Sequence, residues 1–340
     1  MRRWWSVPVL LALLAGGGAV VAPSAPAATG TMTEVTDFGT NPGELQMFAY
    51  VPADLPRGAP LVVVMHGCLS QVTNYDDETG WLQLADARKW ALVFPQQAIT
   101  NNTNLCLNWV SEDDIARGKG EARSIVSMVD WMWRTHGVDA ARIWATGHSA
   151  GGYFTSVLLA TYPDLFKAGA SVSGGPYRCE TYQHVYLAPP GTYVDSSANE
   201  FAARGACTQA GIDRTPEEWG HLLRSGAPRY TGPKPPVSLW HGSADDVVVP
   251  KNFEELVEQW TDYHGIDRSP EVADDVAGHP HRIYADRTGR PLVETYLLTD
   301  RGHSFPGDGS AGCPGQENAG ICAVARIADW FEASAARARR

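Results

Sequence analysis

Short continuous runs of hydrophobic residues alternate with longer amphipathic segments along most of the chain. The runs at 61–65, 91–94, 142–146, 166–173 and 237–240 predict strands, because apolar residues without polar alternation are typical of strands buried on both faces of a parallel sheet. Two more strands are predicted at 46–51 and 293–298. Between them, helices are predicted at 81–90, 120–135, 153–160, 216–224, 252–263 and 321–335. The repeated strand and helix units predict an α/β fold with a doubly wound, mostly parallel sheet and helices on both faces.

The alternation stops at residues 174–235, which are rich in Gly, Pro, Tyr and Cys and contain one predicted helix. An irregular segment of this length over a sheet edge is a usual place for a substrate pocket, so we expect an insertion there that covers the active site. No repeat, low-complexity run or long Gly/Ser linker divides the rest of the chain. We therefore expect a single catalytic domain over residues 29–340.

The first 28 residues have the pattern of a secretory signal peptide. Arg2 and Arg3 precede an apolar run at 4–21, and an Ala-x-Ala processing pattern ends at Ala27. The alternative is an uncleaved membrane anchor, but glycines interrupt the run and no comparable apolar stretch follows. We expect cleavage near Ala27 or Ala28 and a secreted enzyme that makes no membrane contact afterwards.

Charge and cysteine content further limit the partners and the cellular compartment that the sequence allows. Loss of Arg2 and Arg3 with the signal peptide takes the formal net charge from -11 to -13, and the acidic residues are scattered, which argues against a nucleic-acid partner. An even number of cysteines in an exported chain predicts three disulfides. Sequence alone permits many pairings. Pairing nearest neighbours, each around a loop-rich segment, gives Cys68–Cys106, Cys179–Cys207 and Cys313–Cys322.

A single G-x-S-x-G motif stands between the strand predicted at 142–146 and the helix predicted at 153–160. It reads Gly147-His148-Ser149-Ala150-Gly151. At a sharp turn from strand to helix, flanking glycines leave room for the serine hydroxyl to project above the sheet edge. The motif therefore predicts a nucleophile elbow with Ser149 as the nucleophile, rather than an ordinary Gly/Ser turn.

A serine nucleophile needs a base to accept its proton and a carboxylate to orient that base. Asp245 follows the strand predicted at 237–240 and is the expected acid, with Asp246 as the alternative. His303 follows the last predicted strand in a glycine-containing loop and is the expected base. His264, His279 and His281 also lie after the acid, but we expect the first at the surface and the other two in a solvated loop rather than at a metal.

The oxyanion of the reaction needs two N–H donors. We expect them from Ala150, directly after the nucleophile, and from Cys68 in the early loop His66-Gly67-Cys68. Substrate contacts are predicted at Trp109, His148 and Trp240, which lie inside the motifs of the site. The constellation needs neither a metal nor an organic cofactor.

Several separated motifs, in order, give the chain a strong resemblance to polyhydroxybutyrate-depolymerase-like esterases, with the feruloyl and acetylxylan esterases of carbohydrate esterase family 1. They include His66-Gly67-Cys68, Cys106-Leu107-Asn108-Trp109, the serine motif, Trp240-His241-Gly242-Ser243-Ala244-Asp245 and Gly302-His303-Ser304-Phe305-Pro306-Gly307. The resemblance implies an α/β-hydrolase fold, a Ser149/Asp245/His303 triad, a Cys68–Cys106 disulfide and a secreted carboxylic ester hydrolase. His148 stands where these esterases more often have leucine, and the pair Cys313 and Cys322 is an addition.

We therefore expect a monomeric serine esterase that acts through an acyl-enzyme on a polymeric or small ester. The ester is of the polyhydroxybutyrate type or a feruloyl or acetyl ester of a plant polysaccharide. A serine peptidase of the same fold is one alternative, because the same constellation cleaves amides. A non-catalytic binding protein on a hydrolase scaffold is the other.

Overall fold

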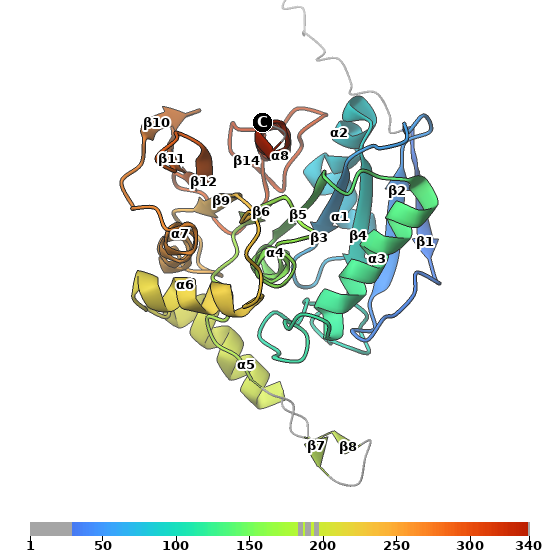
Figure 1. Cartoon of the computed structure of the whole chain (residues 1–340), viewed down its shortest axis with the longest axis horizontal. Helices are drawn as coiled ribbons and strands as arrows, with labels where there is room; N and C mark the ends of the chain where they lie inside the picture. The colour runs from blue at the N-terminus through green and yellow to red at the C-terminus, as the bar shows by residue number, and fades with distance from the viewer. Residues whose placement is uncertain (1–28, 183–185, 188–191, 194–196, 339–340) are drawn as a thin grey trace, which may run out of the picture.

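The computed structural model describes residues 29–182, 186–187, 192–193 and 197–338. The predicted signal peptide, residues 1–28, lies outside the described residues. A ten-stranded sheet forms the centre of the molecule, in the order β1-β2-β4-β3-β5-β6-β9-β12-β11-β10 (Figure 1). Its strands are β1 (Thr31–Val35), β2 (Gln46–Val51), β3 (Leu61–Met65), β4 (Ala91–Gln96), β5 (Ile143–His148), β6 (Ala168–Val172), β9 (Val237–Gly242), β10 (Val272–Val276), β11 (His279–Ala285) and β12 (Pro291–Leu298).

The middle of the sheet is parallel and its edges are antiparallel. β4, β3, β5, β6, β9 and β12 run parallel, and every residue of β3, β5, β6 and β9 is buried, as their continuous apolar runs predict. β1 and β2 at one edge, and β11 and β10 at the other, pair antiparallel with their neighbours. The predicted fold class is confirmed.

Three strands of the sheet were not predicted, and all three lie toward its edges. β1 and β10 are mostly exposed and carry polar residues, so no hydrophobic pattern marks them. β11 begins His279-Pro280-His281, which led to the expectation of a solvated loop. That expectation is wrong, because the backbone pairs with β10 and β12 and both histidine rings are buried.

Helices cover both faces of the sheet (Figure 1). One apolar cluster joins one sheet face to residues of α3, α4, α6 and α7, and a second joins the other face to residues of α1, α2 and α8. The helices of this framework are α1 (Val72–Thr79), α2 (Trp81–Arg88), α3 (Gly120–His136), α4 (Ala150–Thr161), α6 (Pro216–Ser225), α7 (Lys251–His264) and α8 (Ala323–Ala338). Among the described residues, no helix is both long and apolar enough to cross a membrane.

The expected insertion contains short elements that were not predicted, apart from α6. They are the paired strands β7 (Tyr186–Leu187) and β8 (Thr192–Tyr193), the helix α5 (Ser197–Gly205) and the π-helix η1 (Ala206–Ala210). The disulfide Cys179–Cys207 ties η1 to the residues that follow β6. Two more short strands, β13 (Pro306–Gly307) and β14 (Glu317–Asn318), pair beside α8.

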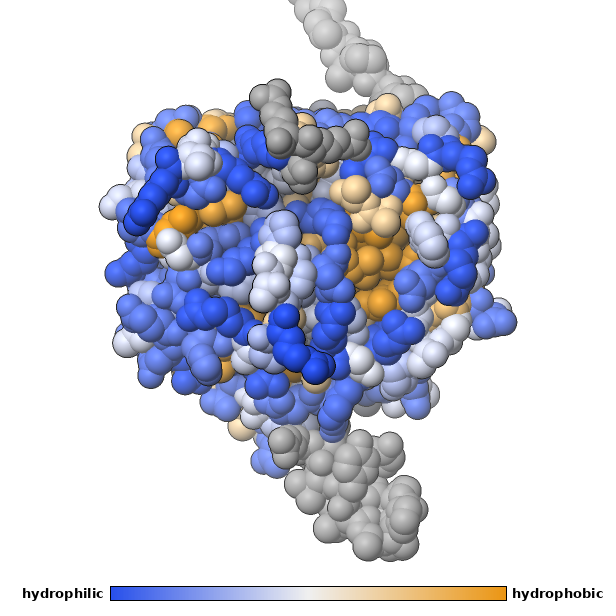
Figure 2. Space-filling view, viewed as in Figure 1, coloured by the Kyte–Doolittle hydropathy of each residue, from blue (hydrophilic) through white to orange (hydrophobic). Residues whose placement is uncertain are grey.

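All six cysteines form disulfides, and the pairs are those that nearest-neighbour pairing predicts. Three disulfides are typical of a protein in an oxidising compartment. Most of the surface in Figure 2 is hydrophilic, with hydrophobic residues gathered in a few areas. Among the described residues, the exposed large hydrophobic side chains are Leu69, Ile99, Trp133, Phe201, Val247 and Val272.

Candidate active site

Ser149 lies at the turn between β5 and α4, at the carboxyl edge of the parallel strands. Its backbone has φ 57° and ψ -119°, a conformation that residues other than glycine rarely adopt. A Cβ added at Gly147 would lie 2.5 Å from the backbone of Gly151, and one at Gly151 would lie 2.3 Å from Met65 O at the end of β3. Only glycine fits both positions, so the sequence motif folds into a sharp elbow that presents the serine hydroxyl at the sheet edge.

His303 lies in the loop after β12 and joins the serine to a carboxylate. Its Nε2 is 2.8 Å from Ser149 Oγ, and its Nδ1 is 2.8 Å from Asp245 Oδ2. The carboxylate fixes the proton on Nδ1, which leaves Nε2 free to accept the serine proton. The structure therefore brings together the three residues that sequence analysis selected, from three different loops.

Asp245 is held by more than the histidine. Its Oδ1 accepts hydrogen bonds from Val247 N at 3.0 Å and from Val248 N at 2.8 Å. Burial alone would raise the pKa of Asp245, but the hydrogen bond and charge of His303, with the Val248 N–H, outweigh it and keep the pKa below its usual value. The neighbouring Asp246 is exposed, so the structure favours Asp245 over that alternative.

A second histidine, His241, contacts the same carboxylate and was not predicted. Its Nε2 lies 2.8 Å from Val248 O and 3.5 Å from Asp245 Oδ2. Burial lowers the pKa of His241, so the ring is neutral, and since both neighbours accept, Nε2 carries the proton. The ring is fully buried and braces the turn that carries Asp245. Its position in the Trp240 to Asp245 motif was the only sequence signal.

The loop expected to supply an oxyanion donor lies directly beside the nucleophile. A Cβ added at Gly67 would lie 3.2 Å from Ser149 Cβ, and Cys68 follows, bridged to Cys106. His66 fixes the loop, because its Nδ1 is 2.7 Å from Gly67 O while its Nε2 accepts from Gln97 N at 3.1 Å. Ala150 is the first residue of α4, where helical N–H groups lack intrahelical partners.

A buried carboxyl group holds the loop that contains Cys106, the partner of Cys68 in that disulfide. Glu121, at the start of α3, accepts from Asn108 N at 2.7 Å and from Gln97 Nε2 at 2.5 Å. Gln97 Nε2 also donates to Cys106 O at 2.8 Å. Burial, and then the nearby Asp114, raise the pKa of Glu121 well above its usual value. These bonds fix residues 106–108 and, through the disulfide, the loop beside Ser149.

Two of the expected substrate contacts are core residues. Trp240 is 1% exposed, stacks on Tyr296 with 3.8 Å between ring centroids, and faces the sheet side covered by α8. Trp109 is 4% exposed and stacks on Tyr153 at 3.9 Å. Neither ring offers an open face, so the expectation that they contact substrate is not supported. For Trp240 the reason is its place in β9, because it precedes His241 and successive residues of a strand face opposite sides of the sheet.

His148, the third expected contact, lies against the catalytic histidine. Its ring centroid is 4.8 Å from that of His303, and the side chain is buried with Nε2 lacking a hydrogen-bond partner among the described residues. Burial, together with the charge of His303, lowers the pKa of His148 to about 3. The His148 ring is therefore neutral at ordinary pH. It places no positive charge beside His303, whose ring becomes an imidazolium when it accepts the serine proton.

The neutral His148 makes the fold sensitive to acid. Its pKa in the unfolded chain is about 6.5, so between about pH 6.5 and pH 3 only the unfolded state gains the proton, and the free energy of unfolding falls as pH falls. From about pH 7 to 5.5, wild type should lose about 1 kcal/mol more than His148→Gln, as measured by urea unfolding. Equal losses in the two proteins would contradict this expectation.

The remaining late histidines have structural partners. His279 Nε2 is 2.8 Å from Ala319 O, and His281 lies between Asp274 at 2.6 Å and Glu294 at 3.3 Å. His264 is half-buried at the end of α7 rather than at the surface. Among the described residues, none of the three has a hydrogen bond to Ser149, Asp245 or His303.

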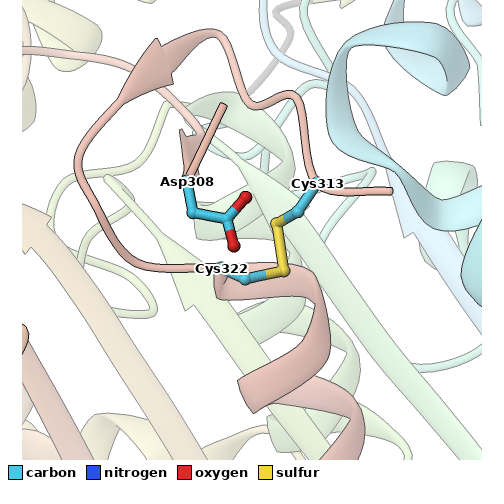
Figure 3. Close-up of side chains that lie close together, drawn as sticks. All are labelled: Asp308, Cys313 and Cys322. Atoms are coloured by element: carbon cyan, nitrogen blue, oxygen red, sulfur yellow. A yellow bond between two sulfur atoms is a disulfide. The ribbon is translucent and has the colours of Figure 1, made fainter. Parts of the chain in front are cut away.

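One group of side chains contains residue types that bind metals, but its two cysteines are oxidised. Asp308, Cys313 and Cys322 lie close together beside α8 (Figure 3). The two sulfur atoms form a disulfide, so neither is a thiolate available to a metal. The disulfide instead closes the loop that follows His303.

The insertion borders the site from the other side. Arg204 of α5 pairs with Glu200 and donates from Nη1 to Cys106 Sγ at 2.9 Å. Gln209 of η1 donates to Val247 O at 2.6 Å, close to Asp245. Segment 197–210 therefore contacts both the disulfide loop and the acid loop, and the exposed side chains of Leu69, Phe201 and Val247 lie on the three segments involved.

Comparisons with known proteins show similarity to ester hydrolases. A family model described as "Esterase PHB depolymerase" matches residues 46–184. The chain is 47% identical over 281 residues to "Poly(3-hydroxyalkanoate) depolymerase C" of Paucimonas lemoignei, covering 83% of this chain and 63% of that protein. It is 30% identical over 302 residues to "Feruloyl esterase B" of Talaromyces funiculosus, covering 88% and 76%. An acetyl xylan esterase structure from Aspergillus awamori aligns with TM-score 0.73 and 25% identity, covering 89% and 100%.

Proposed function

Because this chain belongs to the esterase PHB depolymerase family of serine carboxylic ester hydrolases, we propose that its substrate is a polyester of the hydroxyalkanoate type. The chemistry is supported above all by one observation, the continuous hydrogen-bonded chain from Ser149 Oγ through His303 to Asp245. The polyester is favoured because identity to the depolymerase, at 47%, is well above that to the feruloyl esterase, at 30%.

In the proposed mechanism, Ser149 Oγ attacks the ester carbonyl carbon while His303 Nε2 takes its proton. Asp245 stabilises the imidazolium, and the N–H groups of Ala150 and Cys68 bind the oxyanion. His303 then protonates the leaving alkoxide, and the acyl group remains on the serine. Water, deprotonated by the same histidine, attacks the acyl-enzyme, and His303 then returns that proton to Ser149 Oγ as the acid product leaves. The residues supply every proton transfer that these steps need.

We propose that the enzyme acts outside the cell, on the basis of the predicted signal peptide, the disulfides and the charge. Residues 1–28 would be removed on export, and a mature, monomeric enzyme would meet its polymer outside the cell. The three disulfides support export because they persist only in an oxidising compartment. The scattered negative charge favours neutral esters over polyanions such as nucleic acids.

A plant cell-wall ester is the second candidate, favoured by the structural match to an acetyl xylan esterase over 89% of this chain. One parallel assay separates the two. Purified protein is incubated with amorphous poly(3-hydroxybutyrate), feruloylated arabinoxylan and acetylated xylan, with Ser149→Ala as the blank. We expect release of hydroxybutyrate at the highest rate. Release of ferulate or acetate alone would overturn the polyester proposal, and a matched pair of ester and anilide substrates tests for a peptidase.

A further inference from the structure

A cavity lies at the carboxyl edge of the sheet, two strands away from the serine. It has a volume of about 430 Å³ and is lined by Gln46, Phe48, Gln71, Val72, Thr73, Gln96, Gln97, Ile99 and Leu105. These residues come from the start of β2, the end of β4, the first turn of α1 and the loop before Cys106. The volume falls in the range of small-molecule sites. Nothing in the mechanism above uses this cavity.

The cavity shares a wall with the oxyanion loop. Gln97, which lines it, bonds through its backbone N–H to His66, and His66 is followed by Gly67 beside Ser149. On the other side, Leu105 lines the cavity and precedes Cys106, the disulfide partner of Cys68. Leu69 N donates to Asn104 O at 2.8 Å, which joins the two loops again. Residues 66–69 thus link the wall of the cavity to the loop beside the nucleophile.

Exposed apolar side chains lie both on the loop beside Ser149 and at the cavity. Leu69, one residue after the expected oxyanion donor, is 76% exposed, and Ile99 at the cavity is 58% exposed. Exposed aliphatic residues of this size are few among the described residues. A substrate chain that covered Leu69 and Ile99 would remove both side chains from water, which is favourable.

The residues that line the cavity indicate what kind of molecule it can bind. None of the nine residues carries a charge, so an anionic or cationic ligand would find no ionic partner there. Val72, Ile99, Leu105 and Phe48 supply apolar contact. The side-chain amides of Gln96 and Gln97 already form hydrogen bonds within the protein. Gln96 Oε1, for example, accepts from Val72 N at 2.7 Å. The amides of Gln46 and Gln71, both at exposed positions, can donate to neutral carbonyl oxygens.

From this geometry we infer that the cavity is a distal subsite for a neutral aliphatic polyester chain, several ester units from the bond that is cut. The inference rests on the proposed polyester function and deepens it. Methyl and methylene groups of the chain contact the aliphatic side chains, and ester carbonyls accept from the glutamine amides. The subsite makes hydrolysis depend on chain length, because a short oligomer cannot span from the serine to the cavity.

The test compares kcat/KM for the tetramer and the dimer of 3-hydroxybutyrate. Thr73 is exposed in the first turn of α1, so Thr73→Trp fills the cavity without disturbing the core. The ratio of tetramer to dimer should fall about tenfold, the effect of losing about 1.4 kcal/mol of binding to the longer chain. Ile99→Asp, which places a charge at the cavity, should lower the same ratio. Thr100→Trp, exposed one residue beyond Ile99 and outside the lining, should leave it unchanged.

The wild-type ratio in both Thr73→Trp and Ile99→Asp would overturn the subsite while leaving the polyester function standing. A fall in activity on acetylated xylo-oligosaccharides with an unchanged oligomer ratio would also overturn it, since the occupant would then be a sugar chain. Failure of the wild-type protein to cut either oligomer would instead remove the polyester function itself. Because the measured quantity is a ratio within each protein, partial misfolding of a variant does not imitate the expected result.

Discussion

Replacement of Ser149 by alanine is expected to lower kcat for ester hydrolysis by roughly five powers of ten, while the fold stays intact. The hydroxyl is the group that forms the acyl bond, and it lies 2.8 Å from the expected base. Removing it creates little empty space, because only one oxygen atom is lost at a partly open edge. The measurement is kcat on a soluble short-chain ester, with circular dichroism and thermal unfolding as the check on folding.

Ser243→Ala is the matched control for that experiment. Ser243 also lies at the carboxyl edge of the sheet, and its hydroxyl accepts from Asp300 N at 2.9 Å rather than facing a base. We expect its kcat to stay within about tenfold of wild type, since it makes one ordinary hydrogen bond. Near-normal activity in Ser149→Ala would contradict the assignment of the nucleophile.

The second large effect is expected from Asp245→Asn, which should lower kcat by about three to four powers of ten. An asparagine keeps the shape of the side chain but carries no charge to stabilise the imidazolium of His303. Its amide can also donate to Nδ1, which favours the tautomer that presents a proton, rather than a lone pair, to the serine. The measurement is kcat across the pH range, so that a loss at every pH is distinguished from a displaced pH optimum.

Asp246→Asn provides the control and also tests the alternative acid. The side chain of Asp246 is exposed, and the residue lies between Asp245 and the two residues, Val247 and Val248, whose N–H groups bind the Asp245 carboxylate. Its replacement should leave kcat close to that of wild type. A large loss in Asp246→Asn with little loss in Asp245→Asn would reverse the choice between the two acids.

The sequence predicted the central framework well because that framework depends on local patterns. Runs such as Leu61–Met65 are buried on both faces and have no other reasonable interpretation. The elbow was predictable for the same reason, since Gly147 and Gly151 are required by contacts within a few residues of Ser149 or with the adjacent strand. Edge strands such as Val272–Val276 depend on backbone pairing with a neighbour, and their exposed polar side chains carry no pattern.

The parts of the site that sequence analysis missed are side-chain contacts whose geometry depends on the folded loops, whether the partners are close in sequence, as His241 and Asp245 are, or farther apart, as Glu121 and Gln97 are. His241 meets Asp245 through a turn whose shape is set by two backbone N–H groups. Glu121 reaches Asn108 and Gln97 from the start of another helix. Substrate contacts at Trp109 and Trp240 are not supported, because a motif gives the position of an aromatic ring along the chain but not whether the fold buries it.

The central claim is that Ser149 is the nucleophile of an ester hydrolase and is activated by His303. The most direct measurement is labelling with a fluorophosphonate, followed by mass analysis of the peptides. The expected result is one adduct, on the peptide containing Ser149, with labelling much slower in His303→Ala and absent in Ser149→Ala. An adduct on a different serine, or full ester hydrolysis by protein that takes up no label, would contradict the account.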